Sequence, residues 1–365
     1  MKPAKMKKII LAHDHLFQVG GAEQVLASLH RVFPQVKIHT LINNKSITKD
    51  LLDPDLIVSS NLQKIPGINQ WFKYFLVFMP KVWESTNLSD YDLVISSSSA
   101  FVKGVKVGPQ TKHICYCHAP TRYLWDNQEE YLGNLPEGKL LKKLLPKVLA
   151  GLQAWDYNKA QQVDYFIANS KFIAEKIFRH YHRRSVVIYP PIKVNDFKIS
   201  DNTEDYFLIV SRLRPYKKVD LAIKAFNNLK LPLKIIGTGS EYSYLKKIAQ
   251  SNIEFLGEVD NQTRNDYLAK CRAFIYPQIE DFGITAVEAM ASGRPVIAYA
   301  KGGALETVAE GLSGTFFYEQ TWESLAHKIL RLDDKVFDPK KIREHAQQFD
   351  ESIFQKKILE FVNKL

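Results

Sequence analysis

The stretch that decides the fold runs from Tyr276 to Val308 and reads Y-P-Q-I-E-D-F-G-I-T-A-V-E-A-M-A-S-G-R-P-V-I-A-Y-A-K-G-G-A-L-E-T-V. The apolar residues 273–276 before it predict a buried parallel strand. Gly283 then opens a predicted helix over 284–291, which Gly293 ends. A strand, a glycine turn and a helix start bring unpaired backbone N–H groups together, so this arrangement predicts a site for an anion.

Two glutamates, Glu280 and Glu288, stand eight positions apart in this stretch, the first in a loop and the second inside the predicted helix. Carboxylates accept hydrogen bonds and therefore suit ligands rich in hydroxyl groups. A phosphate site flanked by two such acids predicts a sugar nucleotide as the ligand. An amphipathic helix with incidental acids is the alternative, and the spacing alone does not separate the two.

The frame around these acids, F-G-x-x-x-x-E-A-M-A-x-G-x-P-V over 282–296, resembles the E-x7-E signature of the family-four retaining glycosyltransferases. These are metal-independent enzymes with two domains. The resemblance implies that Glu280 binds hydroxyl groups of the donor sugar and that Glu288 binds the nucleotide ribose. It also implies donor contacts from the turn and helix start between them, namely Phe282, Gly283, Ile284 and Thr285.

The alternation of buried strands and helices in both halves predicts an α/β chain with two doubly wound Rossmann-like domains facing a cleft. The resemblance covers essentially the whole chain and implies the same architecture, the GT-B fold. We expect an acceptor-side domain at 1–190, because the double proline after Tyr189 cannot continue a central strand. A nucleotide-sugar domain is expected at 191–345, and a terminal helix in 346–365 is expected to pack back on the first domain.

The bulk properties fit a two-domain globular protein. The chain has 365 residues, 45% of them hydrophobic and 24% charged. Its three cysteines give no disulfide framework and indicate a reducing cytosol. We see no signal peptide and no apolar run of transmembrane length, so a cytoplasmic protein is expected.

The net charge of +11 is unevenly placed. Residues 1–190 hold 25 Lys and Arg against 15 Asp and Glu, a difference of +10, whereas the remainder holds 25 against 24, a difference of +1. Such an excess favours an anionic membrane or a pyrophosphate-bearing acceptor. Nucleic acid is the less favoured partner, because no recognisable nucleic-acid module accompanies the charge.

Two segments of the first domain have the composition of membrane-interface segments. Residues 65–81 are rich in aromatic and basic side chains, and residues 139–147 are basic and amphipathic. Peripheral contact with the inner face of the cell membrane is one interpretation. Helices that pack on the domain core with their lysines in solvent are the other.

The first strand is predicted over 7–13, and Gly20 and Gly21 follow it at the start of a helix. Two glycines there would let the backbone approach a phosphate closely, although a plain tight turn explains them as well. In the resembling family this loop lies against the donor phosphates and the acceptor. The resemblance therefore implies a donor-binding role for both glycines.

The run H-I-C-Y-C-H-A-P-T-R-Y-L-W-D over 113–126 is the second informative stretch. Its strand ends at His118, so the imidazole is expected to project into the crevice beyond the carboxyl edge of the sheet. Cys115 and Cys117 invite a zinc interpretation. No further ligand set accompanies them, and buried thiols beside a functional histidine are the better account.

The resembling family has a histidine at this strand end that contacts the donor sugar or the acceptor, which implies a catalytic role for His118. The run over 118–126 is similar to the branch that includes O-antigen mannosyltransferases using GDP-mannose. From this similarity we expect transfer of mannose from GDP-mannose to a glycan or polyprenyl-pyrophosphate-linked acceptor in cell-surface polysaccharide synthesis.

In the second domain a buried strand over 206–210 ends near two cations, Arg212 and Lys217. Arginine can grip a phosphate with two hydrogen bonds, and lysine supplies a point charge. The resemblance implies that both bind the donor diphosphate, and a solvated charge cluster is the alternative. Lys218 stands where many members have glycine, so the local turn is expected to be affected.

Glycine exits follow two further predicted strands. Gly237 and Gly239 follow the strand that begins at Leu233, and Gly257 ends the strand that begins at Ile253. In the resembling family such exits line the nucleobase pocket. Nothing in these residues separates guanine from uracil. Gly302 and Gly303 start another helix and are a further candidate contact with phosphate or ribose.

The resemblance implies a retaining transfer in which a donor phosphate oxygen takes the acceptor proton. Arg212, Lys217 and the helix starts at Gly21 and Gly283 would stabilise the leaving diphosphate, so neither a metal ion nor another cofactor is expected. The alternatives are a UDP-sugar-dependent transferase, an epimerase or hydrolase of the same architecture, a non-catalytic ligand binder and a nucleic-acid-binding protein.

Overall fold

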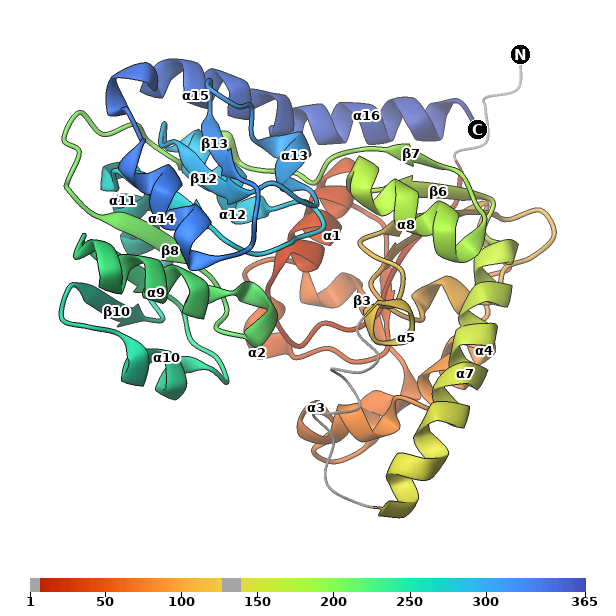
Figure 1. Cartoon of the computed structure of the whole chain (residues 1–365). Coiled ribbons are helices and arrows are strands. Elements are labelled where there is room, and N and C mark those ends of the chain that lie inside the picture. The colour runs from red at the N-terminus through yellow and green to blue at the C-terminus, as the bar shows by residue number, and fades with distance from the viewer. Residues whose placement is uncertain (1–6, 127–138) are drawn as a thin grey trace, which may run out of the picture. The chain divides into compact units, whose positions relative to one another are not determined.

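The computed structural model describes residues 7–126 and 139–365, which divide into two compact units (Figure 1). The N-terminal unit contains the chain up to Tyr189 together with Gln355–Leu365, and the C-terminal unit contains Pro190–Phe354. Each unit is built on its own parallel sheet with helices between consecutive strands. The predicted class, an α/β chain with two Rossmann-like domains, is therefore confirmed.

The sheet of the N-terminal unit has seven parallel strands in the order β3-β2-β1-β4-β5-β6-β7. Their bounds are β1 Ile9–His13, β2 Ile38–Thr40, β3 Ile57–Ser59, β4 Leu93–Ser98, β5 Lys112–Cys117, β6 Tyr165–Ala168 and β7 Ser185–Val187. The order reverses between β1 and β4, the point at which doubly wound sheets bind ligands beyond their carboxyl ends. All six residues of β4 are buried, although its last three are serines.

The helices of this unit connect the strands and cover the sheet. They are α1 Gly21–Val32, α2 Lys45–Thr48, α3 Ile68–Trp71, α4 Met79–Ser85, α5 Arg122–Trp125, α7 Lys139–Gln162 and α8 Lys171–Tyr181. α1 buries Val25, Leu26 and Leu29, which recur at helical spacing. Ser170 caps α8, because its hydroxyl accepts a hydrogen bond from the N–H of Ile173.

The sheet of the C-terminal unit has six parallel strands in the order β10-β9-β8-β11-β12-β13. Their bounds are β8 Phe207–Val210, β9 Leu233–Ile236, β10 Ile253–Gly257, β11 Ala273–Tyr276, β12 Val296–Tyr299 and β13 Gly314–Phe317. Here the order reverses between β8 and β11. The carboxyl ends of these two neighbours lead into the loops that carry Arg212 and Glu280.

The helices of the C-terminal unit are α9 Val219–Leu229, α10 Tyr242–Ile248, α11 Asn261–Lys270, α12 Ile284–Ala291, α13 Ala304–Thr307, α14 Trp322–Leu330 and α15 Pro339–Ala346. α9, α10 and α14 share one apolar core with the sheet, in which Phe207, Phe226 and Ile275 are almost fully buried. Burial of this apolar surface is the main source of stability for the unit.

The last helix, α16 Glu351–Asn363, begins in the C-terminal unit, and its residues from Gln355 onward belong to the N-terminal unit. The ring of Phe361 lies 5.9 Å from the ring of Tyr165 on β6, edge to face. The ammonium of Lys357 lies 6.0 Å from the ring of Tyr189. These contacts tie the end of the chain to the sheet of the N-terminal unit.

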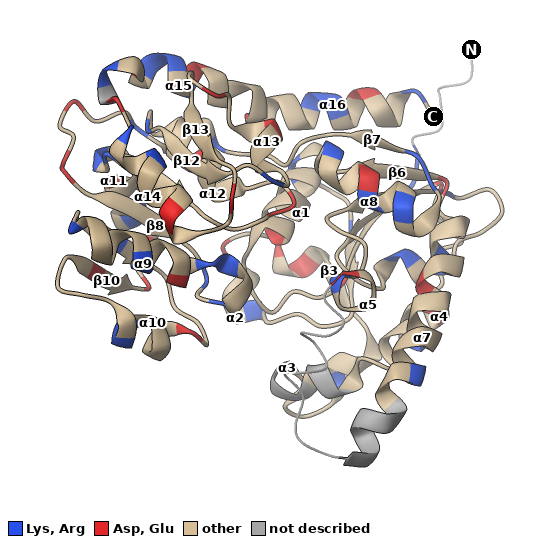
Figure 2. Ribbon diagram, in the orientation of Figure 1, with Lys and Arg blue, Asp and Glu red and all other residues tan. Residues whose placement is uncertain are grey.

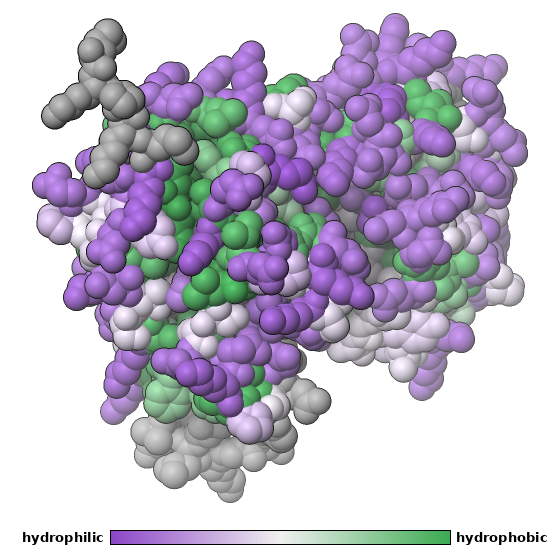
Figure 3. Space-filling model, turned by 180° about the vertical axis from the view of Figure 1, so that it is seen from behind, coloured by the Kyte–Doolittle hydropathy of each residue, from purple (hydrophilic) through white to green (hydrophobic). Residues whose placement is uncertain are grey.

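The surface combines mixed charge with local apolar exposure. Lys and Arg lie on helices of both units and are interspersed with Asp and Glu (Figure 2). Seen from behind, hydrophobic residues gather on the N-terminal unit more than on the C-terminal unit (Figure 3). Phe78, directly before α4, is 55% exposed. Among the described residues, we find no helix with the length and apolar character to span a bilayer.

Candidate functional site

Lys217 and Glu280 form the centre of the candidate site in the C-terminal unit. Lys217 ends a short 3-10 turn after β8, and Glu280 lies in the loop between β11 and α12. The ammonium of Lys217 contacts Oε1 of Glu280 directly. The side chains are only 14% and 15% exposed, so water screens the pair weakly. The fold thus joins two predicted site residues that are 63 positions apart in the chain.

Arg212 lies two residues after β8, and its side chain is exposed. Within residues 7–126 and 139–365, its guanidinium takes part in no ion pair, unlike the ammonium of Lys217. Lys218 adopts the left-handed backbone conformation, with φ 53° and ψ 32°, that glycine takes most readily. The turn before α9 therefore keeps a glycine-like backbone although a lysine occupies it.

The glycine turn before α12 has the predicted geometry. Gly283 is the N-cap and has φ +100°, and a Cβ atom at this position would lie 2.8 Å from the hydroxyl oxygen of Tyr276. Both observations require glycine. The first N–H groups of α12, from Ile284 and Thr285, have no acceptor within the helix, so they can bind an anion. Phe282 is buried beside this turn and contacts the ring of Phe349.

Glu288 places a carboxylate inside the C-terminal unit without fully satisfying it. Its Oε1 lies 3.6 Å from the guanidinium of Arg264 on α11. Its Oε2 is buried and has no hydrogen-bond partner in the described structure. Burial raises the pKa of Glu288, and Arg264 opposes this shift. An unsatisfied buried oxygen is costly, and a ligand hydroxyl would satisfy it.

Several glycines in this unit allow strand exits to pack closely. A Cβ on Gly237 would lie 2.0 Å from the carbonyl oxygen of Ser211, and one on Gly239 would lie 2.2 Å from that of Leu213. Gly303 donates its N–H to the carbonyl of Glu280 at 2.8 Å. A Cβ on Gly303 would lie 2.4 Å from the Cα of Phe282. These glycines hold the loops that carry Arg212 and Glu280, a role that the sequence did not reveal.

In the N-terminal unit His118 follows β5 and belongs to a chain of polar groups. Its Nε2 lies 2.7 Å from the hydroxyl of Ser97 on β4, and this hydroxyl lies 3.1 Å from Nδ1 of His13 at the end of β1. Nε2 of His13 lies 3.7 Å from Oε1 of Glu23 on α1. Burial lowers the pKa of His118 to about 3, so its imidazole is neutral near pH 7.

The glycine loop before α1 is closed by an internal cap. Gly20 is the N-cap, and its N–H donates to Oε2 of Glu23 at 2.8 Å. Gly21 is the first residue of the helix. In the loop whose backbone was expected to approach a phosphate, the N–H of Gly20 thus has a partner in the protein. A glutamate three residues after the N-cap forms the acidic half of a capping box, because its carboxylate reaches back to the N-cap N–H, whereas glycine has no side chain to supply the other half.

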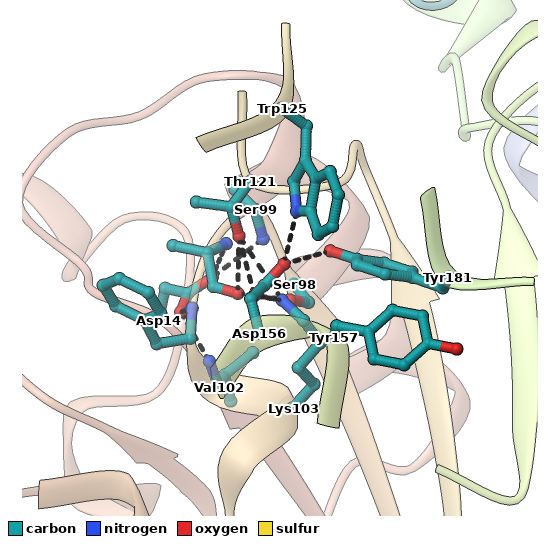
Figure 4. Close-up of polar contacts among 12 residues, drawn as sticks. Asp14, Ser98, Ser99, Val102, Lys103, Thr121, Trp125, Asp156, Tyr157 and Tyr181 are labelled. Carbon is teal, nitrogen blue, oxygen red and sulfur yellow. Dashed lines mark hydrogen bonds and ion pairs between the residues drawn. The ribbon is translucent and has the colours of Figure 1, made fainter. Parts of the chain in front are cut away.

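Asp14 links the ends of β1 and β4 (Figure 4). One carboxylate oxygen accepts the N–H groups of Ser99 and Ala100 at 2.8 and 2.7 Å, and the other accepts those of Phe101 and Val102, both at 2.8 Å. Four backbone donors on one buried carboxylate hold the chain after β4 in place. Ser97 and His13, which precede these segments, are thereby fixed relative to each other.

A buried ion pair anchors the segment after His118 (Figure 4). The ammonium of Lys103 lies 2.6 Å from Oδ1 of Asp156 on α7, and both side chains are buried. Oδ2 of Asp156 accepts hydrogen bonds from the indole of Trp125 at 2.8 Å and from the hydroxyl of Tyr181 at 2.6 Å. Trp125 belongs to the run that suggested the GDP-mannose branch. Its observed contact supports the fold of the domain.

The cysteines of the C-x-C-H run are buried in the N-terminal unit. Cys115 and Cys117 are free thiols in the core, where burial raises the pKa of Cys117 well above its ordinary value. Within the described parts of the chain, we find no group of three or more His, Cys, Asp or Glu side chains that could hold a metal ion.

The structure therefore arranges the predicted residues in two clusters. The C-terminal unit joins Lys217 to Glu280 and places Glu288 on the helix that Gly283 opens. The N-terminal unit joins His118 to the glycine loop through Ser97, His13 and Glu23. Sequence reasoning missed His13 and Ser97. Their only signal is that polar residues follow or end buried apolar strands.

Replacing Gly303 by alanine tests the close packing around Glu280. The added methyl group must displace the backbone of Phe282, so we expect a loss of roughly 1–3 kcal/mol in the free energy of unfolding. Thermal and denaturant unfolding of Gly303→Ala measures this loss. Gly151→Ala is the control, because nothing lies within 4 Å of a Cβ there. Equal stability of the two variants would contradict the packing role.

Comparison with known proteins follows the same division of the chain. Residues 19–196 match the family described as Glycosyltransferase Family 4, and residues 193–349 match the one described as Glycosyl transferases group 1. An uncharacterized glycosyltransferase of Methanocaldococcus jannaschii is 29% identical over 207 residues, which are 55% of this chain and 59% of that protein. The chain thus spans less than two thirds of this relative.

The alpha-1,3/1,6-mannosyltransferase ALG2 of Dictyostelium discoideum is 25% identical over 310 residues, which cover 71% of this chain and 70% of that enzyme. The crystal structure of HepE from Anabaena in complex with UDP and glucose superposes with a TM-score of 0.72 at 19% identity, covering 98% of this chain and 100% of HepE. Sucrose-phosphate synthase from Thermosynechococcus elongatus gives a TM-score of 0.70 at 16% identity, covering 98% of this chain and 99% of that enzyme.

These likenesses confirm the predicted fold, and the two family matches confirm the predicted family. The chain belongs to the family-four glycosyltransferases and has the GT-B fold.

Proposed function

We propose that this protein transfers mannose from GDP-mannose, with retention of anomeric configuration, to a glycan or polyprenyl-pyrophosphate-linked acceptor in cell-surface polysaccharide synthesis. The observation that carries the proposal is the contact between Lys217 and Glu280 beside the N-terminus of α12. A cation, a carboxylate and free helix N–H groups in one place suit a ligand that carries both phosphates and hydroxyl groups.

The donor would be held by complementary groups of the C-terminal unit. Arg212 and Lys217 would bind the diphosphate, and the first N–H groups of α12 would add partial positive charge. Glu280 would accept hydrogen bonds from the sugar. Glu288, whose Oε2 has no partner in the described structure, would accept them from the ribose. The donor-binding roles given to Gly20, Gly21, Gly237 and Gly239 are part of the same proposal.

In the proposed reaction the bond between the anomeric carbon and the diphosphate oxygen breaks, and a bond from the same carbon to the acceptor oxygen forms. The proton of the acceptor hydroxyl passes to a donor phosphate oxygen. The negative charge that develops on the leaving diphosphate is stabilised by Arg212 and Lys217. Neutral His118 would orient a sugar hydroxyl by hydrogen bonding. We assign no carboxylate as a nucleophile and no metal ion.

Mannose is proposed because several curated relatives, ALG2 of Dictyostelium discoideum among them, are named alpha-1,3/1,6-mannosyltransferases. The second candidate is transfer from a UDP-sugar. It is favoured by the fold neighbour HepE, whose crystal structures contain UDP and UDP-glucose. An epimerase or hydrolase on the same fold is distinguished from both because it forms product without an acceptor.

A donor screen tests the proposal. GDP-mannose and GDP should raise the melting temperature of the protein more than UDP-glucose and UDP, with the same shifts in EDTA. Incubation with GDP-mannose should release GDP at an appreciable rate only when an acceptor is present. The product anomeric configuration, measured by NMR, should match that of the donor. Stabilisation by uridine nucleotides alone would favour the second candidate, and acceptor-independent turnover would favour the epimerase or hydrolase.

Arg212 provides a matched pair of variants for the charge-stabilising role. Arg212→Ala should lower kcat/KM by an amount equivalent to roughly 2–4 kcal/mol in the barrier, with little effect on unfolding, because the side chain is exposed. Arg214 is also exposed and lies in the same loop. Arg214→Ala should retain near-wild-type turnover. Wild-type turnover in Arg212→Ala would remove the assignment.

We also propose that the N-terminal unit contacts an anionic membrane from the cytoplasmic side. Phe78 and Val77 are 55% and 45% exposed beside exposed Lys81. Apolar and basic groups side by side suit a membrane interface. The side chains of Gln70, Trp71, Lys73, Tyr74 and 139–144, which prompted this interpretation, lie outside the described residues.

Exposed phenylalanines in the N-terminal unit allow a direct test of membrane contact. Phe78→Ser should reduce co-sedimentation with vesicles that contain anionic lipid several-fold, because it removes an apolar anchor. Phe178 on α8 is 59% exposed, and Phe178→Ser should leave co-sedimentation unchanged. Absence of binding by the wild-type protein, or equal loss in both variants, would overturn the proposal.

A further inference from the structure

Four polar side chains form a continuous chain at the carboxyl ends of β1, β4 and β5. Glu23 lies 3.7 Å from His13, His13 lies 3.1 Å from Ser97, and Ser97 lies 2.7 Å from His118. His13 and Glu23 are each 2% exposed, and Ser97 is fully buried. Glu23, His13 and Ser97 have no other role in the proposed reaction. They are nevertheless connected to His118, which has one.

The number of available protons limits which of these side chains can donate a hydrogen bond and which must accept one. The hydroxyl of Ser97 lies between two imidazole nitrogens and has a single proton. It can donate to one nitrogen and must accept from the other. If it donates to Nδ1 of His13, it accepts from an N–H at Nε2 of His118. If it donates to His118 instead, His13 must carry its proton on Nδ1.

The charge of Glu23 determines which of these two hydrogen-bonding arrangements is favoured. Burial would raise the pKa of Glu23, but hydrogen bonding to its carboxylate opposes this effect, and the net result is a lowered pKa and an ionised carboxylate. Its charge is also stabilised by the N–H of Gly20 and by its position in the first turn of α1. Nε2 of His13 faces this anion, so a proton there is favoured over a lone pair.

The separation of 3.7 Å between Nε2 of His13 and Oε1 of Glu23 is longer than that of a close ion pair. A pair formed by an imidazolium and a carboxylate would draw together to about 2.7–2.9 Å. A neutral His13 with its proton on Nε2 has an acceptor at Nδ1, and Ser97 donates to it. Ser97 then accepts from Nε2–H of His118, which leaves Nδ1 of His118 unprotonated.

We propose that Glu23, His13 and Ser97 are positioning residues that hold His118 in the Nε2–H tautomer, so that its Nδ1 accepts a hydrogen bond from a substrate hydroxyl. Nδ1 of His118 forms no hydrogen bond within the described residues, whereas Nε2 is bound to Ser97. The hydroxyl is that of the donor sugar or of the acceptor, and this part rests on the proposed function. The tautomer itself does not depend on which reaction the enzyme performs.

The other charged groups near these residues do not supply an alternative partner for Nε2 of His118. Asp14 is saturated by four backbone N–H groups. Arg122 acts on His118 only by charge, and His15 packs against the rings of Phe17 and Phe72. The Ser97 hydroxyl is therefore the group that sets the His118 proton.

Long-range ¹H–¹⁵N NMR of histidine-labelled protein, without substrate, reads the tautomer directly. Wild-type His118 should show the Nε2–H pattern near pH 7. Ser97→Ala and Glu23→Gln should each convert it to a mixture of tautomers. Ser96→Ala is the matched control, because Ser96 bonds to Nε2 of His113 at 2.8 Å from the same strand. It should leave the signals of His118 unchanged.

Kinetics of the same variants test the positioning role. Ser97→Ala and Glu23→Gln should lower kcat/KM about ten-fold, the effect of misorienting one hydrogen bond, and Ser96→Ala should not. Two results would overturn the proposed positioning of His118 by Glu23, His13 and Ser97. One is an Nδ1–H pattern for His118 in the wild-type protein, and the other is a His118 tautomer that both variants leave unchanged. A changed tautomer with unchanged kcat/KM would overturn its role in turnover. If no donor is turned over at all, the proposed function fails, but the NMR result still shows whether Glu23, His13 and Ser97 set the tautomer of His118.

Discussion

The ion pair between Lys217 and Glu280 is the interaction on which the candidate site depends. It joins the loop after β8 to the loop after β11, and these strands are neighbours where the strand order reverses. Both side chains are largely buried, so removing either one would leave an uncompensated charge. The pair keeps a cation and an acid in place before any ligand arrives. A ligand that carries both phosphates and hydroxyl groups can engage both partners at once.

The same topological feature organises the N-terminal unit. Its strand order reverses between β1 and β4, and His13, Ser97 and His118 lie at the carboxyl ends of three adjacent strands. Asp14 holds the first two strand ends together through four backbone N–H groups. In both units parallel pairing therefore gathers polar side chains that are far apart in the chain.

Elements with strong local signals could be predicted from the sequence. The strand over 273–276 and the helix over 284–291 have the predicted bounds, because apolar runs and glycine turns encode them locally. The strand predicted over 7–13 spans only Ile9–His13. Strand ends depend on pairing with neighbours, which composition does not reveal.

Side-chain partners across strands could not be predicted in the same way. The contact between Ser97 and His118 depends on the register of β4 against β5, and the contact between Gly303 and Phe282 depends on how two loops pack. The Gly20–Glu23 cap is local, and its spacing could have been recognised. Family resemblance indicated which residues matter, whereas their physical roles required the three-dimensional structure.

The central claim is that the Lys217–Glu280 pair is the donor site, in which Lys217 binds the diphosphate and Glu280 binds the sugar. Until a donor arrives, Glu280 occupies the charge of Lys217 and so competes with a phosphate for it. Calorimetric titration of Glu280→Gln with GDP and with GDP-mannose tests it most directly. Because the substitution removes the internal competitor, GDP should bind roughly three- to ten-fold more tightly than to the wild-type protein, while the added affinity due to the sugar should fall. Equal or weaker binding of GDP by Glu280→Gln would contradict the account.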